Sequence, residues 1–238
     1  EAEDGLFKLL EAAAEREDLP EPVQDYLDQI AHFNPAGEAR IYPGSPVLMA
    51  QLLRHEARDR LKLFEMHPTD IQALAGNMAQ LELGRAVQVS REDGFESLKK
   101  LLPPPASAGG SKRAMVLMDP SYEIKSDYTK VSHTIQECLK RFPTGTYLVW
   151  YPIIPRPEAH ELPRRLRTLA NQAKRSWVHA TLAIGRGEEG DTGLSASGMF
   201  VINPPYTLAE QLRAALAVVG PALARGNGKG WQVEAGGA

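Results

Sequence analysis

Cysteine is almost absent from this sequence, and its scarcity excludes two kinds of stabilisation. Cys138 is the single cysteine among 238 residues, so the chain can form neither an internal disulfide nor a zinc site built on several cysteines. No apolar run approaches the roughly 20 residues that a membrane-spanning helix needs, and no signal peptide opens the chain. We therefore expect a cytoplasmic protein without a membrane partner.

The sequence also lacks an excess of positive charge. The formal net charge is −3, with 27 basic against 30 acidic residues, so no global basic field indicates a nucleic-acid partner, and a local basic face stays open as an alternative. A hydrophobic content of 43% is typical of a globular chain, and 238 residues suffice for one full core and a small subdomain.

The start of the chain lacks the features with which a nucleotide-binding fold begins. Its first residue is Glu1 rather than a methionine, and a helical pattern follows at once, with no glycine-rich turn before it. We expect a segment of a longer protein, whose first strand and glycine-containing turn lie upstream of Glu1.

Hydrophobic periodicity predicts an α/β fold. Helices are predicted over residues 4–16, 22–33, 46–55, 69–78, 94–101, 130–142, 157–174 and 208–224. Strands are predicted over residues 61–64, 86–89, 114–118, 146–151, 177–184, 198–202 and 231–233. Strands and helices alternate until the last strands, which follow one another, so we expect a mostly parallel sheet with an antiparallel edge.

The stretch from residue 114 to Tyr122 carries the clearest chemical pattern. An apolar strand ends at Asp119-Pro120, and Tyr122 follows three residues after the acid. Ligands of open α/β sheets bind at the carboxyl ends of the strands, and an acceptor, a rigid turn and a flat ring together suit an amine-bearing base. The alternative is a plain turn, because Asp-Pro commonly ends a strand.

Three other positions are candidates for holding a nucleotide. Glu65 follows a predicted strand, where its carboxylate could accept from ribose hydroxyls, or it is a surface-turn residue. Asp93-Gly94 could hold a ring edge and admit a ligand close to the backbone, or Asp93 only caps a helix. Ser45 is predicted to cap the helix that begins at Pro46.

Basic residues gather in and just after the predicted helix over residues 157–174. They are Arg164, Arg165, Arg167, Lys174 and Arg175. Such a run is a candidate phosphate-facing surface, and a solvated helix face is the alternative.

The stretch Gly185–Gly190 matches the dinucleotide pattern G-x-G-x-x-G, but no helical pattern follows it. The fingerprint needs a strand, a turn and a helix in that order, so we interpret this stretch as the loop of a hairpin between two strands.

Asp119-Pro120-Ser121-Tyr122 resembles the D-P-P-Y signature of amino methyltransferases that use S-adenosylmethionine. Further motifs follow the same order along the chain: Tyr42-Pro43-Gly44-Ser45-Pro46, Glu65-Met66-His67-Pro68, Asp93-Gly94-Phe95, Thr144-Gly145-Thr146-Tyr147, Trp150-Tyr151-Pro152, Ser197-Gly198-Met199 and Ile202-Asn203-Pro204-Pro205. Together they resemble the RlmJ family, which methylates N6 of an adenine in 23S ribosomal RNA.

The resemblance implies a Rossmann-like methyltransferase domain over residues 43–238 and a helical insertion subdomain over residues 1–42. It also implies an S-adenosylmethionine pocket lined by Ser45, Glu65, Asp93, Gly94 and Asp119. Within that pocket Glu65 is expected at the ribose hydroxyls, with Asp93 and Gly94 beside the cofactor's adenine.

For the target base, the resemblance implies that the Asp119 carboxylate and the Pro120 carbonyl hold the amine while Tyr122 stacks on the ring. Ser121 and Lys125 are expected to contact the substrate. The expected partner is protein-free or early-assembly 23S ribosomal RNA, bound by a monomer, and the chemistry requires no metal.

Two departures keep other functions open. Ser121 replaces the second proline of the signature, and the family's amino-terminal segment, with its cofactor-binding residues, is not in this sequence. The alternatives are a DNA adenine-N6 methyltransferase and a non-catalytic DNA-utilisation or nucleic-acid-binding protein with a methyltransferase-like fold.

Overall fold

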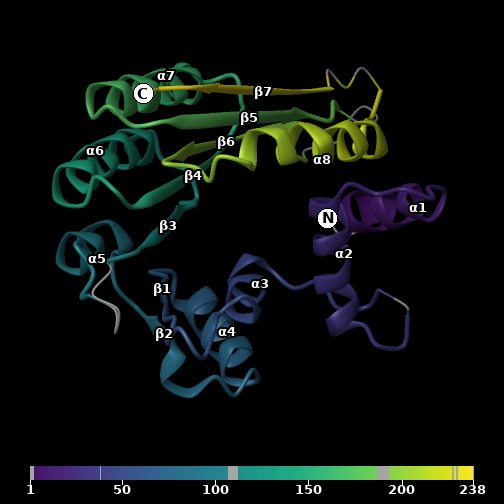
Figure 1. Ribbon diagram of the computed structural model, residues 1–238, viewed down its shortest axis with the longest axis horizontal. Helices are drawn as coiled ribbons and strands as arrows, with labels where there is room; N and C mark the ends of the chain where they lie inside the picture. Colours follow the sequence, from purple (N-terminus) through teal and green to yellow (C-terminus); the bar gives the residue numbers. More distant parts are fainter. Residues whose placement is uncertain are drawn as a thin grey trace. The chain divides into compact units, whose positions relative to one another are not determined.

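The protein is described from a computed structural model, which defines residues 3–37, 39–106, 112–186, 193–226, 228 and 230–237 (Figure 1). The chain divides into two compact units. Unit 1 comprises residues 1–24 and 102–238, and unit 2 comprises residues 25–101. The sequence-based boundary between residues 42 and 43 divides the chain differently and stays a prediction.

Unit 2 contains a small parallel sheet with helices packed on it. Its elements are most of α2 (Glu21–Phe33), α3 (Ser45–Gln51), β1 (Leu61–Phe64), α4 (Pro68–Ala79), the 3-10 turn η2 (Gly84–Ala86), β2 (Val87–Ser90) and α5 (Gly94–Leu101). β1 and β2 pair in parallel, and a core around Ala50, Leu63 and Met78 joins α3, β1 and α4. Both strands therefore end at the same edge of this sheet.

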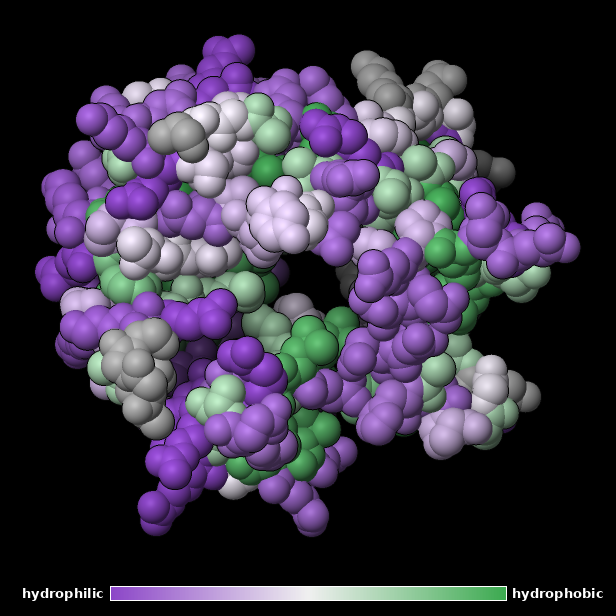
Figure 2. Space-filling view, in the orientation of Figure 1, coloured by the Kyte–Doolittle hydropathy of each residue, from purple (hydrophilic) through white to green (hydrophobic). Residues whose placement is uncertain are grey.

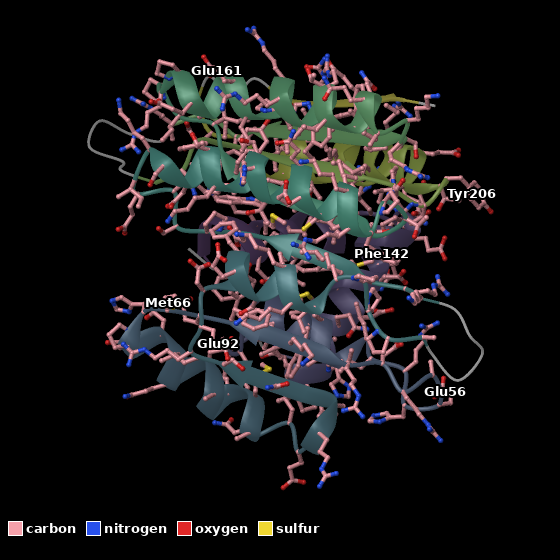
Figure 3. The ribbon with its side chains drawn as sticks, turned by 90° about the vertical axis from the view of Figure 1, so that its left-hand side faces the viewer. Glu56, Met66, Glu92, Phe142, Glu161 and Tyr206 are labelled. Atoms are coloured by element: carbon pink, nitrogen blue, oxygen red, sulfur yellow. The ribbon has the colours of Figure 1, made fainter. Side chains whose placement is uncertain are left out.

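Unit 1 is built on a five-stranded sheet in the order β3-β4-β6-β5-β7. Its elements are the π-helical turn η1 (Glu3–Phe7), α1 (Lys8–Ala14), β3 (Met115–Met118), α6 (Ser126–Arg141), β4 (Thr146–Pro152), α7 (Pro157–Gln172), β5 (Trp177–Ala183), β6 (Ala196–Ile202), α8 (Leu208–Leu223) and β7 (Gly230–Gly236). β3 and β4 are parallel, and the other neighbouring strands are antiparallel. α6 and α7 cover one face of this sheet and α8 the other (Figures 1 and 3).

Strand β4 shows why a helix covers this face. Its side chains alternate between buried and half-buried positions, as expected of a strand with distinct faces. Tyr147, Val149 and Tyr151 are the buried set, and the Tyr147 hydroxyl donates to the Phe142 carbonyl just after α6 at 2.5 Å. α6 buries a stripe of residues spaced three and four apart against them. The two periodicities together determine how sheet and helix meet.

The turn before β4 is closed by a side chain from far along the chain. The Asn203 side-chain nitrogen donates to the carbonyls of Pro143 at 2.9 Å and Gly145 at 2.7 Å. The Asn203 carbonyl accepts from the Thr146 hydroxyl at 3.1 Å. The two motifs that contain these residues therefore join the start of β4 to the end of β6.

The order of elements is the predicted one, and the prediction of an α/β fold with parallel pairs and an antiparallel edge is confirmed. Two helix boundaries differ from the prediction by four residues, because α3 ends at Gln51 rather than at residue 55 and α6 starts early. α6 begins at Ser126 rather than at residue 130, because the buried residues Asp127 and Tyr128 already belong to its first turn. α7 begins at Pro157, as predicted, and continues through Pro163 to Gln172.

The antiparallel strands differ from their predicted lengths for a tertiary reason. β7 extends over Gly230–Gly236 because it pairs with β5 along its whole length. β5 and β6 pair from Trp177 opposite Ile202 to Ala183 opposite Ala196, which is the predicted hairpin. Residues 187–192 of the G-x-G-x-x-G stretch and its loop lie outside the described part of the chain.

The packing at Gly198 predicts a measurable limit on side-chain volume. A Cβ atom at Gly198 would lie 2.4 Å from the Tyr151 ring, which is buried and whose hydroxyl is 2.7 Å from His179 Nε2. We expect Gly198→Ala to lower the free energy of unfolding by about 1–3 kcal/mol, as overpacked cores do. Urea unfolding measures this difference.

A matched control lies in α4. A Cβ atom at Gly76 would meet nothing within 4 Å. We expect Gly76→Ala to be neutral or to stabilise by up to about 1 kcal/mol through helix propensity. An equal loss of stability in both variants would contradict the packing explanation.

Candidate active site

The candidate residues of unit 1 lie on the connection between β3 and α6. Asp119 follows β3 directly, and β4 runs parallel beside β3, so both strands end at this edge of the sheet. Asp119 and Ser121 are exposed, and Pro120 between them is half-buried. The acid thus stands where the sequence predicts it, at the carboxyl end of a parallel strand.

Tyr122 is the fixed point of this connection. Its side chain is 2% exposed, its ring centroid lies 4.6 Å from that of Tyr128, and its hydroxyl donates to the Trp150 carbonyl at 2.6 Å. Burial and the nearby Asp119 carboxylate raise the pKa of the phenol, so it stays a hydrogen-bond donor. Its φ of 54° is left-handed, which costs a non-glycine residue on the order of 1 kcal/mol. The tertiary contacts hold this strained conformation.

Two charged side chains tie the same connection to the start of α7. Arg156 Nη1 donates to the carbonyls of Tyr122 at 3.2 Å and Glu123 at 3.3 Å. Lys125 Nζ lies 3.5 Å from Glu158 Oε1, so the amino ends of α6 and α7 are bridged by an ion pair. The Lys125 side chain is 74% exposed and keeps access to solvent.

Sequence reasoning did not single out Arg156. Its partners are backbone carbonyls, and the Tyr122 carbonyl lies 34 residues earlier in the chain. No local pattern marks such a contact, since every residue offers a carbonyl.

The two acceptors predicted to hold an amine are both free. Neither the Asp119 carboxylate nor the Pro120 carbonyl accepts a hydrogen bond from the residues that the structure describes. The Asp119 side chain reaches solvent, and partial burial still raises its pKa above the ordinary carboxyl value. This edge of unit 1 therefore offers two unpaired acceptors beside one rigid turn.

The ring of Tyr122 does not offer a free face in this conformation. Tyr128 packs at 4.6 Å and Trp150 at 6.4 Å between centroids, and the side chain is almost fully buried. Stacking on a base would require one face to be uncovered, so the predicted platform role stays a prediction. In this conformation Tyr122 anchors the turn between β3 and α6 to β4.

In unit 2, the predicted nucleotide-binding acids lie at the carboxyl ends of two adjacent parallel strands. Glu65 follows β1, and one of its oxygens accepts from the His67 backbone N–H at 2.7 Å. Asp93 follows β2 and caps α5, because its Oδ1 accepts from the Phe95 backbone N–H at 2.8 Å. Met66 and Glu92, labelled in Figure 3, mark this end of the sheet. The second oxygen of each acid accepts no hydrogen bond from the described residues.

The structure explains Gly94 by packing. A Cβ atom there would lie 3.2 Å from Phe64 Cβ, so the glycine lets the start of α5 approach β1. The prediction that it admits a ligand to the backbone stays untested.

The capping role predicted for Ser45 is wrong. Gly44 is the N-cap, with an extended backbone, and its carbonyl accepts from Val47 at 3.0 Å and Leu48 at 3.2 Å. Ser45 is the first helical residue, exposed and without a capping bond, because the extended backbone that an N-cap requires is at Gly44. Its hydroxyl therefore remains available to a ligand.

Two kinds of feature are missing from the described residues. No group of three or more His, Cys, Asp or Glu side chains there could hold a metal ion. Nor does that part of the chain contain a helix long and apolar enough to cross a membrane.

Comparison with known proteins gives concordant matches. The family model described as "Ribosomal RNA large subunit methyltransferase D, RlmJ" matches residues 1–235. Ribosomal RNA large subunit methyltransferase J of Escherichia coli K12 is 37% identical over 202 residues, which are 85% of this chain and 67% of that protein. The protein of the same name from Haemophilus influenzae is 38% identical over 218 residues, which are 91% of this chain and 73% of that protein.

A solved structure agrees with these matches. The crystal structure of protein LPL1258 from Legionella pneumophila has a TM-score of 0.75 and 28% sequence identity, covering 94% of this chain and 77% of that one. The fold is that of a Rossmann-like methyltransferase, as predicted. By sequence match over nearly its whole length, the chain belongs to the RlmJ family of ribosomal RNA large subunit methyltransferases.

Proposed function

We propose that this protein is an S-adenosylmethionine-dependent methyltransferase that modifies N6 of an adenine in 23S ribosomal RNA. Family membership supports methyl transfer to large-subunit RNA. The observation that supports adenine N6 is the pair of unpaired acceptors at Asp119 and Pro120, set beside a rigid turn. A monomer in the cytoplasm, acting on protein-free or early-assembly RNA, completes the proposal.

The target amine explains why two acceptors are needed. The lone pair of an exocyclic adenine amine is delocalised into the ring, which makes the nitrogen a poor nucleophile. Hydrogen bonds from its two N–H groups to the Asp119 carboxylate and the Pro120 carbonyl would turn the lone pair out of the ring and stabilise the positive charge that develops. The proton lost from nitrogen goes to Asp119 or to water, and a raised carboxyl pKa makes Asp119 a better proton acceptor.

The cofactor side of the proposal rests on unit 2. S-adenosylmethionine, when bound, supplies a methyl group activated by a positively charged sulfur. The free oxygen of Glu65 suits the ribose hydroxyls, because a carboxylate accepts from both members of a diol. The free oxygen of Asp93 suits the donor edge of the adenine, and Ser45 and Gly94 are assigned to the same pocket.

The substrate side rests on the connection after β3. Ser121 and Lys125 are exposed there and are assigned to contacts with the RNA, Lys125 as a partner for phosphate. An adenine within paired RNA must leave its stack to reach Asp119. We assign Tyr122 to holding the turn, and to stacking on the base if one ring face is uncovered on binding.

The decisive experiment compares nucleic acids. The protein is incubated with labelled S-adenosylmethionine and either protein-free 23S ribosomal RNA or duplex DNA. We expect label on adenine N6 of the RNA alone. Label on DNA alone would select a DNA methyltransferase. Binding of nucleic acid without transfer to either would favour a non-catalytic protein.

Asp119→Asn should reduce methyl transfer by roughly 10²–10⁴-fold, because it removes both the charge and the proton acceptor. The side chain is exposed and unpaired, so the unfolding midpoint should stay unchanged. Single-turnover transfer to 23S RNA measures the loss, and a variant that retains parental rates would contradict the assigned role.

Glu65→Gln should weaken binding of S-adenosylmethionine by about tenfold or more, since hydrogen bonds to a charged acceptor are worth about 1.5–3 kcal/mol. Isothermal titration calorimetry with the cofactor gives the affinity. Glu56→Gln is the control, because Glu56 is an exposed acid of the same unit with no assigned role. Equal affinities in the two variants would remove Glu65 from the pocket.

Arg156→Gln should lower kcat about tenfold while leaving the KM for S-adenosylmethionine unchanged, because Arg156 positions the turn that carries Asp119. Arg156→Lys should restore part of kcat, since one ammonium can donate to both carbonyls. Steady-state kinetics separates the two constants. A change confined to KM, or a large loss of stability, would speak against a positioning role.

A further inference from the structure

A shallow groove, lined mainly by residues with polar or charged ends but with much apolar carbon at its surface, runs between α6 and α7 in unit 1. It has a volume of about 430 Å³. The residues that line it include Thr129, Ser132, His133, Arg164, Arg165 and Thr168. The α6 residues recur three and four positions apart, so they lie on one side of that helix. Figure 3 looks onto the two helices, and in Figure 2, where this side is seen edge-on, the left-hand rim of unit 1 is mostly hydrophilic.

The charge of the groove is of one sign. Arg164 and Arg165 are exposed, and no carboxylate is among the lining residues. Arg165 Nη2 lies 3.4 Å from Glu161 Oε2, an exposed pair at the rim in which Glu161 is labelled in Figure 3. The Arg164 guanidinium has no hydrogen bond to the described residues. Since exposed pairs contribute little, the groove offers two guanidinium groups to an anion.

The basic run predicted from sequence is divided by the fold. Arg167 pairs with Glu234, and its guanidinium carbon lies 4.7 Å from the centre of the Trp177 ring. Arg167 therefore serves the packing of α7 on the sheet. Arg164 and Arg165 lie on the groove side of the same helix and are free of that task.

Neutral side chains in the groove add hydrogen-bond donors to the two guanidinium groups. The Ser132 and Thr168 hydroxyls are already engaged, because they donate to the carbonyls of Thr129 and Arg164, both at 3.0 Å. The side chains of Thr129 and Gln136 make no hydrogen bond to the described residues. Guanidinium forks with neighbouring amide and hydroxyl donors match the oxygens of a phosphodiester.

The groove also lies within reach of the proposed chemistry, in the same unit. The ion pair between Lys125 and Glu158 brings the starts of α6 and α7 together beside the Asp119 edge. At 1.5 Å per residue, Thr129 and Gln136 lie about 5 Å and 15 Å along α6 from its first residue. That span corresponds to a few nucleotides of an RNA strand.

We propose that the α6–α7 groove binds phosphate groups of the RNA strand that flanks the target nucleotide. This rests on the proposed function for the nature of the substrate. The groove increases the affinity for RNA and positions the strand so that the target adenine reaches the connection after β3, where the methyl transfer takes place. An acidic protein segment would meet the same charges, but nothing would then place it beside the methyl-transfer edge.

The test uses the full-length protein and a fluorescein-labelled 23S RNA fragment, with binding followed by anisotropy across a salt series. Arg164→Gln with Arg165→Gln should weaken binding on the order of tenfold and reduce the slope of log K against log salt by about 1–1.5. At saturating RNA kcat should equal that of the parent, while the KM for RNA rises.

The matched control is Lys140→Gln with Arg141→Gln. It also removes two positive charges, but from the exposed end of α6 outside the groove. Equal losses in the two double variants, or no loss in either, would overturn the proposal. A third result would also overturn it: inorganic phosphate binds at the groove arginines, but the substitutions leave the RNA affinity unchanged. The groove would then be an anion site that takes no part in RNA binding.

Failure of the groove proposal and failure of the proposed function give different results. Suppose that the parent protein transfers no methyl group, yet the groove variant binds RNA more weakly than the control variant does. The groove proposal is then supported and the proposed reaction is contradicted. If the parent methylates RNA and the groove variant has an unchanged KM for RNA, the reaction stands and the groove proposal falls.

Discussion

The hydrogen bond from the Tyr122 hydroxyl to the Trp150 carbonyl, at 2.6 Å, is the contact on which the candidate chemistry depends. It anchors the connection after β3 to β4 and offsets a left-handed backbone at Tyr122. Arg156 adds two bonds from the start of α7. With the turn held from both sides, Asp119 and Pro120 need no partners of their own, and their oxygens stay available to a substrate.

The motifs that carry the family resemblance divide into two physical classes. Asn203, Gly145 and Gly198 close a turn or leave room for a buried ring, so they serve folding. Asp119 and Glu65 keep free oxygens at the carboxyl ends of strands, where folding does not require them. A resemblance spread over the whole chain therefore reports a shared core as much as a shared reaction.

Much of this fold could be predicted because the relevant signals are local. The alternation in β4 and the three-and-four spacing in α6 are properties of neighbouring residues. The predicted β4 matches the structure closely, and the predicted α6 matches it except at its start. The length of β7 and the early start of α6 could not be predicted, because a partner strand and buried side chains decide them. Ser45 failed as a cap because the choice between adjacent residues depends on one backbone angle, which Gly44 supplies.

The sequence by itself determined the order of the elements, the place of Asp119 at a strand end and the family, since each follows from residue types at fixed spacing. Only the tertiary structure decided that Tyr122 is buried and strained, that Arg156 holds its turn, and that Arg167 separates from Arg164 and Arg165. These features arise from contacts between residues far apart in the chain. Such contacts depend on how helices and strands pack, and local periodicity carries no information about them.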